Sequence, residues 1–170
     1  DLHIDLETMW DLINISYYDN DKPLLLGIAT DDSHNYHQRS TSLSNTGRGW
    51  VMVNSKKIET LSLIESMESG NFYSSSGIEL KKVKRNNKRF VVEVEPNKGV
   101  NYEITFIGYR KDDSQTQVLK TVKGNSASYI FNENDLFVRA KISSDEIKTN
   151  PYVEGETTQA WTQPVIVNTK

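Results

Sequence analysis

Apolar residues recur at helical spacing in the first twenty or so positions of the chain. Leu6, Met9, Trp10 and Ile13 fall on one face of this stretch, which predicts a helix that buries that face in a core. Asp5 is a suitable N-cap, because its carboxylate can accept from a free N–H of the first turn. Trp10 is expected to be the core anchor of this helix.

A second stretch further along has the same period and recognisable ends. Ser55 is a candidate N-cap and Gly70 a candidate glycine just after the last turn. Between them Ile58, Leu61 and Ile64 follow one another at steps of three residues along one side. The pattern predicts a second amphipathic helix that ends before residue 71.

Between the two predicted helices, residues 24–29 are apolar at every position, and after Thr30 they lead into the polar sequence Asp-Asp-Ser-His. An unbroken apolar run is typical of a strand covered on both faces, as in a parallel α/β sheet. The sequence Trp-Val-Met-Val at residues 50–53 predicts another short strand. Helix, short loop and buried strand together indicate an α/β repeat over residues 1–77.

From about residue 78 the apolar residues alternate with polar ones at a period of two. The alternating runs cover residues 90–94, 102–107, 127–131, 136–142 and 165–167, and turn-forming Asn, Asp and Gly residues separate them. About seven short strands with one polar face are typical of an antiparallel immunoglobulin-like β-sandwich. We therefore predict an α+β chain in which a partial α/β segment, residues 1–77, precedes a β-sandwich domain, residues 78–170.

Charge and composition narrow the classes of partner. The net charge of −3 gives no general electrostatic case for nucleic-acid binding, and no apolar run is long enough to span a bilayer. Without cysteine, disulfides and thiolate metal sites are excluded. Six basic residues between positions 81 and 89 form either a binding patch or a solvated hairpin face, and they lack the interleaved aromatic residues that stack on bases.

Candidate chemistry lies where the apolar run ends. Asp32 and His34 are two residues apart, so in an extended backbone their side chains point to the same side and form half of a metal site. Arg48, between Gly47 and Gly49, either holds an anionic group or is a solvated loop residue. The two glycines would let the backbone pass close to another surface.

Several motifs resemble one known family when they are taken in order. Residues 29–34, Ala-Thr-Asp-Asp-Ser-His, resemble the last metal-binding motif of the PHP (polymerase and histidinol phosphatase) superfamily. The flanking sequences resemble a bacterial branch of PHP-type metal-dependent phosphoesterases, akin to carbaryl-hydrolase-like metallohydrolases. These are Trp10-Asp11, Gly47-Arg48-Gly49-Trp50, Gly70-Asn71-Phe72-Tyr73-Ser74-Ser75-Ser76-Gly77 and Ala160-Trp161-Thr162-Gln163-Pro164-Val165.

The resemblance implies a fold, a chemistry and a set of roles. Its members have a distorted (β/α)₇ barrel, often followed by a β-sandwich, and hydrolyse small phosphoesters with divalent Zn, Mn or Fe. By motif position Asp32 and His34 would be metal ligands and hence catalytic. Asp31 would orient His34 or a metal-bound water without binding the metal itself. His37 would be a loop residue or a further contact of the site.

The family's opening His-x-His motif and its middle ligands have no counterpart here, because the other histidines are His3 and His37 alone. Residues 1–4 also lack an initiator Met and a signal peptide. We therefore expect a C-terminal fragment of a longer metallohydrolase, inactive unless another segment supplies ligands, with exposed barrel edges that favour self-association. The alternative is a β-sandwich that acts as a non-catalytic binding module. The compartment, cytoplasm or periplasm, stays open.

Overall fold

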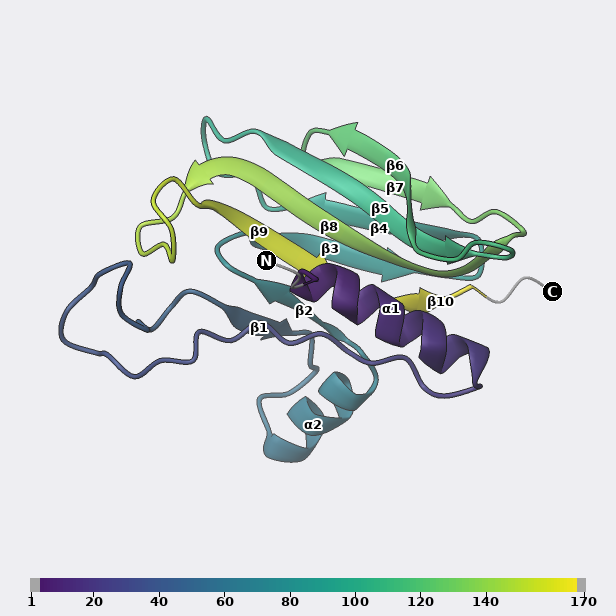
Figure 1. Ribbon diagram of the computed structural model, residues 1–170, viewed down its shortest axis with the longest axis horizontal. Coiled ribbons are helices and arrows are strands. Elements are labelled where there is room, and N and C mark those ends of the chain that lie inside the picture. Colours follow the sequence, from purple (N-terminus) through teal and green to yellow (C-terminus); the bar gives the residue numbers. More distant parts are fainter. Residues whose placement is uncertain (1–3, 168–170) are drawn as a thin grey trace.

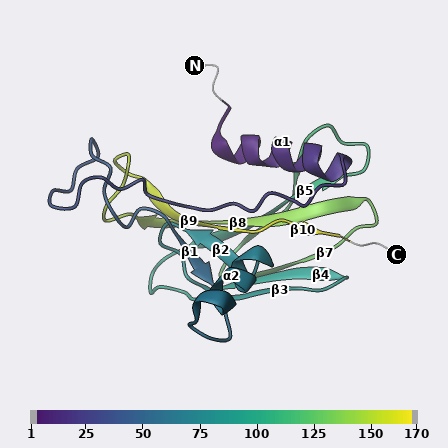
Figure 2. The ribbon, with the colours of Figure 1, turned by 90° about the horizontal axis from the view of Figure 1, so that it is seen from below.

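The computed structural model describes residues 4–167, which form three layers (Figure 1, Figure 2). Helix α1 lies over one face of a seven-stranded sheet, and a three-stranded sheet lies against the other face. The elements in chain order are α1 (Leu6–Asp19), β1 (Trp50–Val53), α2 (Thr60–Glu68), β2 (Phe72–Ser75), β3 (Leu80–Arg85), β4 (Arg89–Val94), β5 (Tyr102–Arg110), β6 (Gln117–Lys123), β7 (Ser126–Ile130), β8 (Asp135–Ile147), β9 (Thr157–Thr162) and β10 (Val165–Ile166).

Every pair of named strands in the described residues is antiparallel. The larger sheet has the order β1-β2-β9-β8-β5-β6, with β10 also paired to β8, and the smaller sheet has the order β3-β4-β7. Strand β2 pairs with β9, so the larger sheet contains strands from both sides of residue 77. The division into two domains at that residue stays a prediction.

The core lies between the two sheets and confirms the α+β, β-rich class. Phe90 of β4 and Tyr129 of β7 both pack on Phe106 of β5, with ring centroids 5.9 and 5.6 Å apart. All three rings are buried, as the alternating pattern of their strands predicts. The strands expected over residues 90–94, 102–107, 127–131 and 136–142 are confirmed as β4, β5, β7 and β8.

Helix α1 begins after its predicted N-cap but buries a different face, which carries Asp11 and Asn14. Asp5 Oδ1 accepts from the N–H of Thr8 at 3.0 Å. The predicted core face is largely outside, because Leu6 is 81% exposed and Met9 45% exposed. The expectation that this apolar face forms the core was wrong. Beneath α1 the sheet presents Arg139 and Lys141, which pair with Asp11 and Glu7 of the helix, and it also presents Tyr109 and Phe137, on which Tyr18 packs.

Helix α2 lies below β1, at the edge of the larger sheet (Figure 1). It ends as predicted at Gly70, whose φ of +67° lies in the left-handed region that favours glycine. It begins at Thr60 rather than after Ser55, because the Ser55 hydroxyl bonds to the Lys57 carbonyl and the Ser62 hydroxyl. Neither helix in residues 4–167 has the length and apolar character needed to cross a bilayer.

Candidate metal centre

The apolar run before the Asp-Asp-Ser-His sequence is not a buried strand. Residues 24–30 belong to no sheet, and Leu25 and Ile28 are 42% and 59% exposed. The prediction of a strand covered on both faces was therefore wrong. The run lies on the surface between α1 and the edge of the larger sheet, where one side faces solvent (Figure 1).

Side chains hold this run at every second residue. The N–H of Leu25 donates to Asn14 Oδ1 at 2.6 Å, that of Gly27 to Gln163 Oε1 at 2.8 Å, and that of Ala29 to Ser74 Oγ at 2.9 Å. These bonds fix the inner edge of an extended segment, since the N–H groups of alternate residues point the same way. On the outer edge, no described residue accepts from the N–H of Leu26 or Ile28.

Glycine at position 27 allows the run to lie against α1. A Cβ at this position would lie 2.8 Å from the Trp10 ring. The Trp10 indole N–H donates to the Leu25 carbonyl at 2.8 Å. Trp10 thus anchors the run to the helix, although it does not enter the main core between the sheets.

Asp32 and His34 lie close together at the end of the run. Asp32 Oδ1 is 4.0 Å from His34 Nδ1, and the side chains are 87% and 69% exposed. The backbone reaches this arrangement through a turn, because Asp32 has a φ of +45° rather than the extended value expected. The predicted proximity is therefore present, on a different backbone conformation.

The imidazole is also oriented by the main chain. His34 Nδ1 lies 2.6 Å from the carbonyl oxygen of Asp32, which favours the tautomer with its proton on Nδ1. The Nε2 lone pair is then free, and this is the nitrogen that binds a metal in most such histidines. For a cation to contact both side chains, one of these exposed groups must change rotamer.

The pair is an incomplete metal site within the described residues. No group of three or more His, Cys, Asp or Glu side chains in residues 4–167 is close enough to hold one ion. Zinc requires three or four protein ligands, and Mn or Fe sites with two ligands are weak. The donor types fit Zn, Mn or Fe, but two donors are too few to hold such an ion without further ligands.

Asp31 closes the loop that follows. Its Oδ2 accepts from the N–H of Gly47 at 2.6 Å, and its carbonyl accepts from the hydroxyl of Tyr152 at 2.8 Å. This carboxylate oxygen is thus engaged by the loop and not by His34. Its role in orienting His34 or a metal-bound water stays a prediction.

Arg48 fits neither of the two interpretations made from the sequence. Its side chain is only 2% exposed, and its guanidinium donates to the carbonyls of Leu43, Ser40 and Asn150. It also stacks on the Tyr152 ring at 4.3 Å. The interpretation of Arg48 as a solvated arginine is therefore wrong. Its guanidinium donors are already used inside the loop, so they do not hold a substrate anion.

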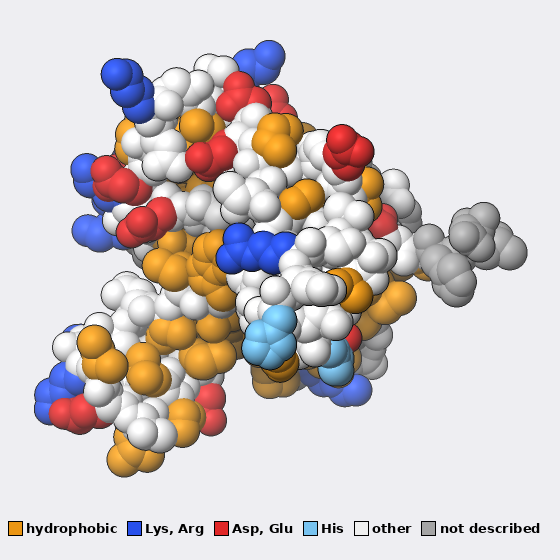
Figure 3. Space-filling view, turned by 90° about the vertical axis from the view of Figure 1, so that its left-hand side faces the viewer, with side chains coloured by type: hydrophobic (Ala, Val, Ile, Leu, Met, Phe, Trp, Pro, Cys, Tyr) orange, Lys and Arg blue, Asp and Glu red, His pale blue; other side chains and the backbone are white. Residues whose placement is uncertain are grey.

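The other loop features have simpler outcomes. Gly49 makes the close approach expected of the glycine pair, since a Cβ there would lie 3.0 Å from the Thr30 carbonyl oxygen. His37 is exposed. It and His34, the two histidines of the described residues, lie on the face of the molecule that Figure 3 shows. Whether His37 touches a site stays a prediction.

The segment 148–156 is the part of this region that the sequence did not indicate. Asn150 and Tyr152 support Arg48 and Asp31, and the Asn150 amide donates to the Thr46 carbonyl at 2.8 Å. These contacts join residues more than 100 positions apart. No local pattern could have revealed them.

Compared with models of protein families, with curated proteins and with solved structures, the chain matches none.

Proposed function

We propose that this chain is part of a PHP-type metal-dependent phosphoesterase and that Asp32 and His34 contribute the last Asp-x-His pair to its metal site. The remaining ligands would come from protein segments outside residues 1–170. The substrate would be a small phosphoester. The chain alone is then expected to be inactive.

The observation that carries the proposal is the combination of an open edge with a ligand pair at its end. Residues 24–30 are extended and fixed on one side by Asn14, Ser74 and Gln163, while the N–H groups of Leu26 and Ile28 face outward. An edge of this kind pairs readily with a neighbouring strand. In a barrel, the ligands that follow such a strand lie at its catalytic end.

Exposed apolar residues around this edge support the same interpretation. They occur on α1 and just before it, on the run itself, and on α2 and just before it, and they are Ile4, Leu6, Met9, Leu12, Leu25, Ile28, Ile58, Leu61 and Ile64, each at least 40% exposed. Apolar side chains that gather on a surface usually mark an interface with another protein segment. Missing barrel elements would bury them.

The roles of the two side chains follow from ordinary metal chemistry. A bound divalent metal lowers the pKa of its water and neutralises phosphoryl oxygens. His34 would bind it through Nε2, held in orientation by the Asp32 carbonyl, and the Asp32 carboxylate would supply a hard oxygen ligand. Arg48 and Asp31 would keep the loop in shape without contacting substrate.

The test is the activity of the complete gene product that contains these residues. With Mn²⁺ it should release phosphate from p-nitrophenyl phosphate, and Asp32→Asn or His34→Gln should each lower the rate by about 100-fold or more. Asp112→Asn is a matched control, since it removes a carboxylate from an exposed turn after β5. Full metal-dependent turnover in the Asp32→Asn/His34→Gln double variant would show that the proposal is wrong.

The second candidate is a binding module without catalysis. It is favoured by a groove beside β3, which has a basic rim and an apolar floor. This groove is independent of the Asp32–His34 pair, and it is the subject of the next subsection.

A further inference from the structure

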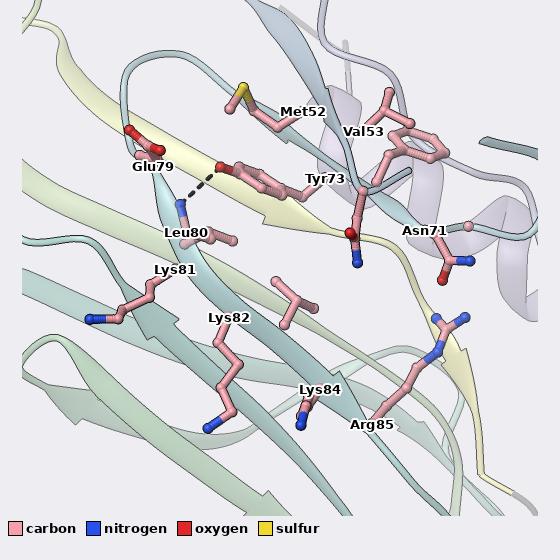
Figure 4. A pocket seen from close by; sticks show the side chains of 14 residues that line it. Met52, Val53, Asn71, Tyr73, Glu79, Leu80, Lys81, Lys82, Lys84 and Arg85 are labelled. Atoms are coloured by element: carbon pink, nitrogen blue, oxygen red, sulfur yellow. Dashed lines mark hydrogen bonds between the residues drawn. The ribbon is translucent and has the colours of Figure 1, made fainter. Parts of the chain in front are cut away.

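A groove of about 640 Å³ separates β3 from the paired strands β1 and β2 and from the turn that precedes β2. Figure 3 shows the hollow, lined with hydrophobic side chains, between the body of the molecule and the lobe that carries α2. In the close view of Figure 4, Met52 and Tyr73 point toward it from the β1–β2 side and Leu80 from β3. Its floor is therefore apolar.

Strand β3 is an edge strand, and its outer edge faces this groove. In the smaller sheet β3 pairs with β4 alone among the described strands. Two side-chain bonds close the ends of the groove. The Leu80 N–H donates to the Tyr73 hydroxyl at 2.8 Å, and the Arg85 guanidinium donates to the Ser69 carbonyl at 3.3 Å. Between them the edge is open for about 15 Å, at roughly 3.3 Å per residue.

The rim of the groove is basic. Its lining includes Lys81, Lys82, Lys84 and Arg85 but a single carboxylate, Glu79. Lys82 pairs with Glu93 at 2.7 Å and Lys81 with Glu95 at 3.8 Å, both on β4. Within the described residues no carboxylate lies within 4.0 Å of Lys84 or Arg85. Two exposed cations beside an open strand edge are thus unneutralised.

We propose that this groove binds an extended acidic peptide segment, which pairs with the outer edge of β3 as an added strand. Main-chain hydrogen bonds to β3 provide affinity, as in other cases of strand addition. Because side chains alternate along a strand, every second residue of the peptide faces the apolar floor near Leu80 and Val83. The residues between them present carboxylates to Lys84 on the other face of β3, whereas Arg85, on the face of Val83, lies at the end of the added strand.

A nucleic acid fits this groove less well than a peptide. Its two aromatic residues, Phe72 and Tyr73, are 6% and 8% exposed, so neither offers a ring face for base stacking. The net charge of −3 also opposes the binding of an extended polyanion such as a nucleic acid. The free backbone edge, which nucleic acids cannot pair with, favours a polypeptide.

The test uses fluorescence anisotropy of the 170-residue chain with a labelled eight-residue peptide that alternates Val with Glu. Saturable binding is expected, and it should weaken about 10-fold or more when alternate peptide nitrogens are methylated or when Lys replaces Glu. Lys84→Glu/Arg85→Glu should also weaken it about 10-fold or more. Lys111→Glu, on the exposed turn after β5, is the control and should change affinity less than about 2-fold.

Amide chemical shifts locate the peptide. The changes are expected on β3 and on Met52 and Asn71 across the groove. No saturable binding at millimolar peptide, equal binding of the Lys peptide, an equal effect of Lys111→Glu, or shifts confined to the edges formed by β6 and β7 would each overturn the proposal. So would tighter binding of a single-stranded oligonucleotide at the same groove.

Discussion

Arg139 of β8 holds Asp11 of α1 in a two-pronged ion pair that joins residues 128 positions apart. Arg139 Nε donates to Asp11 Oδ1 at 2.7 Å, and its terminal nitrogen donates to Oδ2 at 2.8 Å. The two side chains are 2% and 8% exposed. This buried ion pair, together with the packing of Tyr18 on Tyr109 and Phe137, fixes the first helix to the larger sheet, and Leu6 and Met9 of the apolar stripe face outward.

The first prediction concerns the free energy of unfolding when this pair is broken. Asp11→Ala leaves a buried guanidinium short of its main partner, and such losses cost about 3–5 kcal/mol. Replacing both partners, as Asp11→Leu/Arg139→Met, should cost less, because no buried charge is then left over. Urea denaturation followed by far-UV circular dichroism measures all three proteins.

Lys57→Ala is the control for that comparison. Lys57 pairs with Glu59 at 3.6 Å, and both side chains are more than 60% exposed. An exposed pair contributes about 0–1 kcal/mol. If Asp11→Ala were as mild as Lys57→Ala, α1 would not be held to the sheet by this contact.

The second prediction concerns pH and the neighbouring carboxylate of Glu7. Burial raises the pKa of Glu7. The hydrogen bond and charge of Lys141 and the charge of Arg139 together lower this pKa by more, so it lies below the usual 4.5. A carboxyl with a lowered folded-state pKa stabilises the fold above about pH 4.5. This contribution is lost as pH falls through the folded-state pKa.

Thermal unfolding from pH 7 to pH 3 measures the effect. Glu7→Gln should be less stable than the parent at pH 7, and the difference in Tm should shrink as the pH falls below about 4.5. A difference that stays constant or grows toward pH 3 would show that Glu7 is not stabilised in its ionised form.

The third prediction concerns Arg48 and the loop that carries Asp32 and His34. Arg48→Met removes donors from three carbonyls in a buried setting, which should cost about 3 kcal/mol and increase proteolysis within residues 31–47. Arg39→Met, at an exposed position of the same loop, should change the free energy of unfolding by about 0.5 kcal/mol or less. Equal effects of the two substitutions would contradict the structural role of Arg48.

The sheets could be read from the sequence because their signal is local. Phe90, Val92 and Val94 alternate with more exposed residues along β4, and the core needs that alternation whatever the neighbouring strands are. The helix ends at Asp5 and Gly70 are likewise set by cap geometry within one turn.

The predictions that were wrong concern features that depend on residues far away in the sequence. The face that α1 buries is decided by Arg139, and the environment of the 24–30 run by Ser74 and Gln163. The sequence indicated that Asp32 and His34 lie together, which the loop achieves. It could not indicate that Asn150 accepts from the Arg48 guanidinium or that Tyr152 donates to the Asp31 carbonyl.

The most direct test of the proposed metal site follows Mn²⁺ binding to the 170-residue chain by NMR. Paramagnetic Mn²⁺ at the Asp32–His34 pair should broaden the His34 ring signals and the amides of residues 32–34 first, with the exposed Asp112 as an internal reference. Asp32→Asn should abolish this selectivity, and Mg²⁺ at the same concentration should broaden nothing. Broadening that is equal at Asp112, or absent at His34, would contradict the metal site.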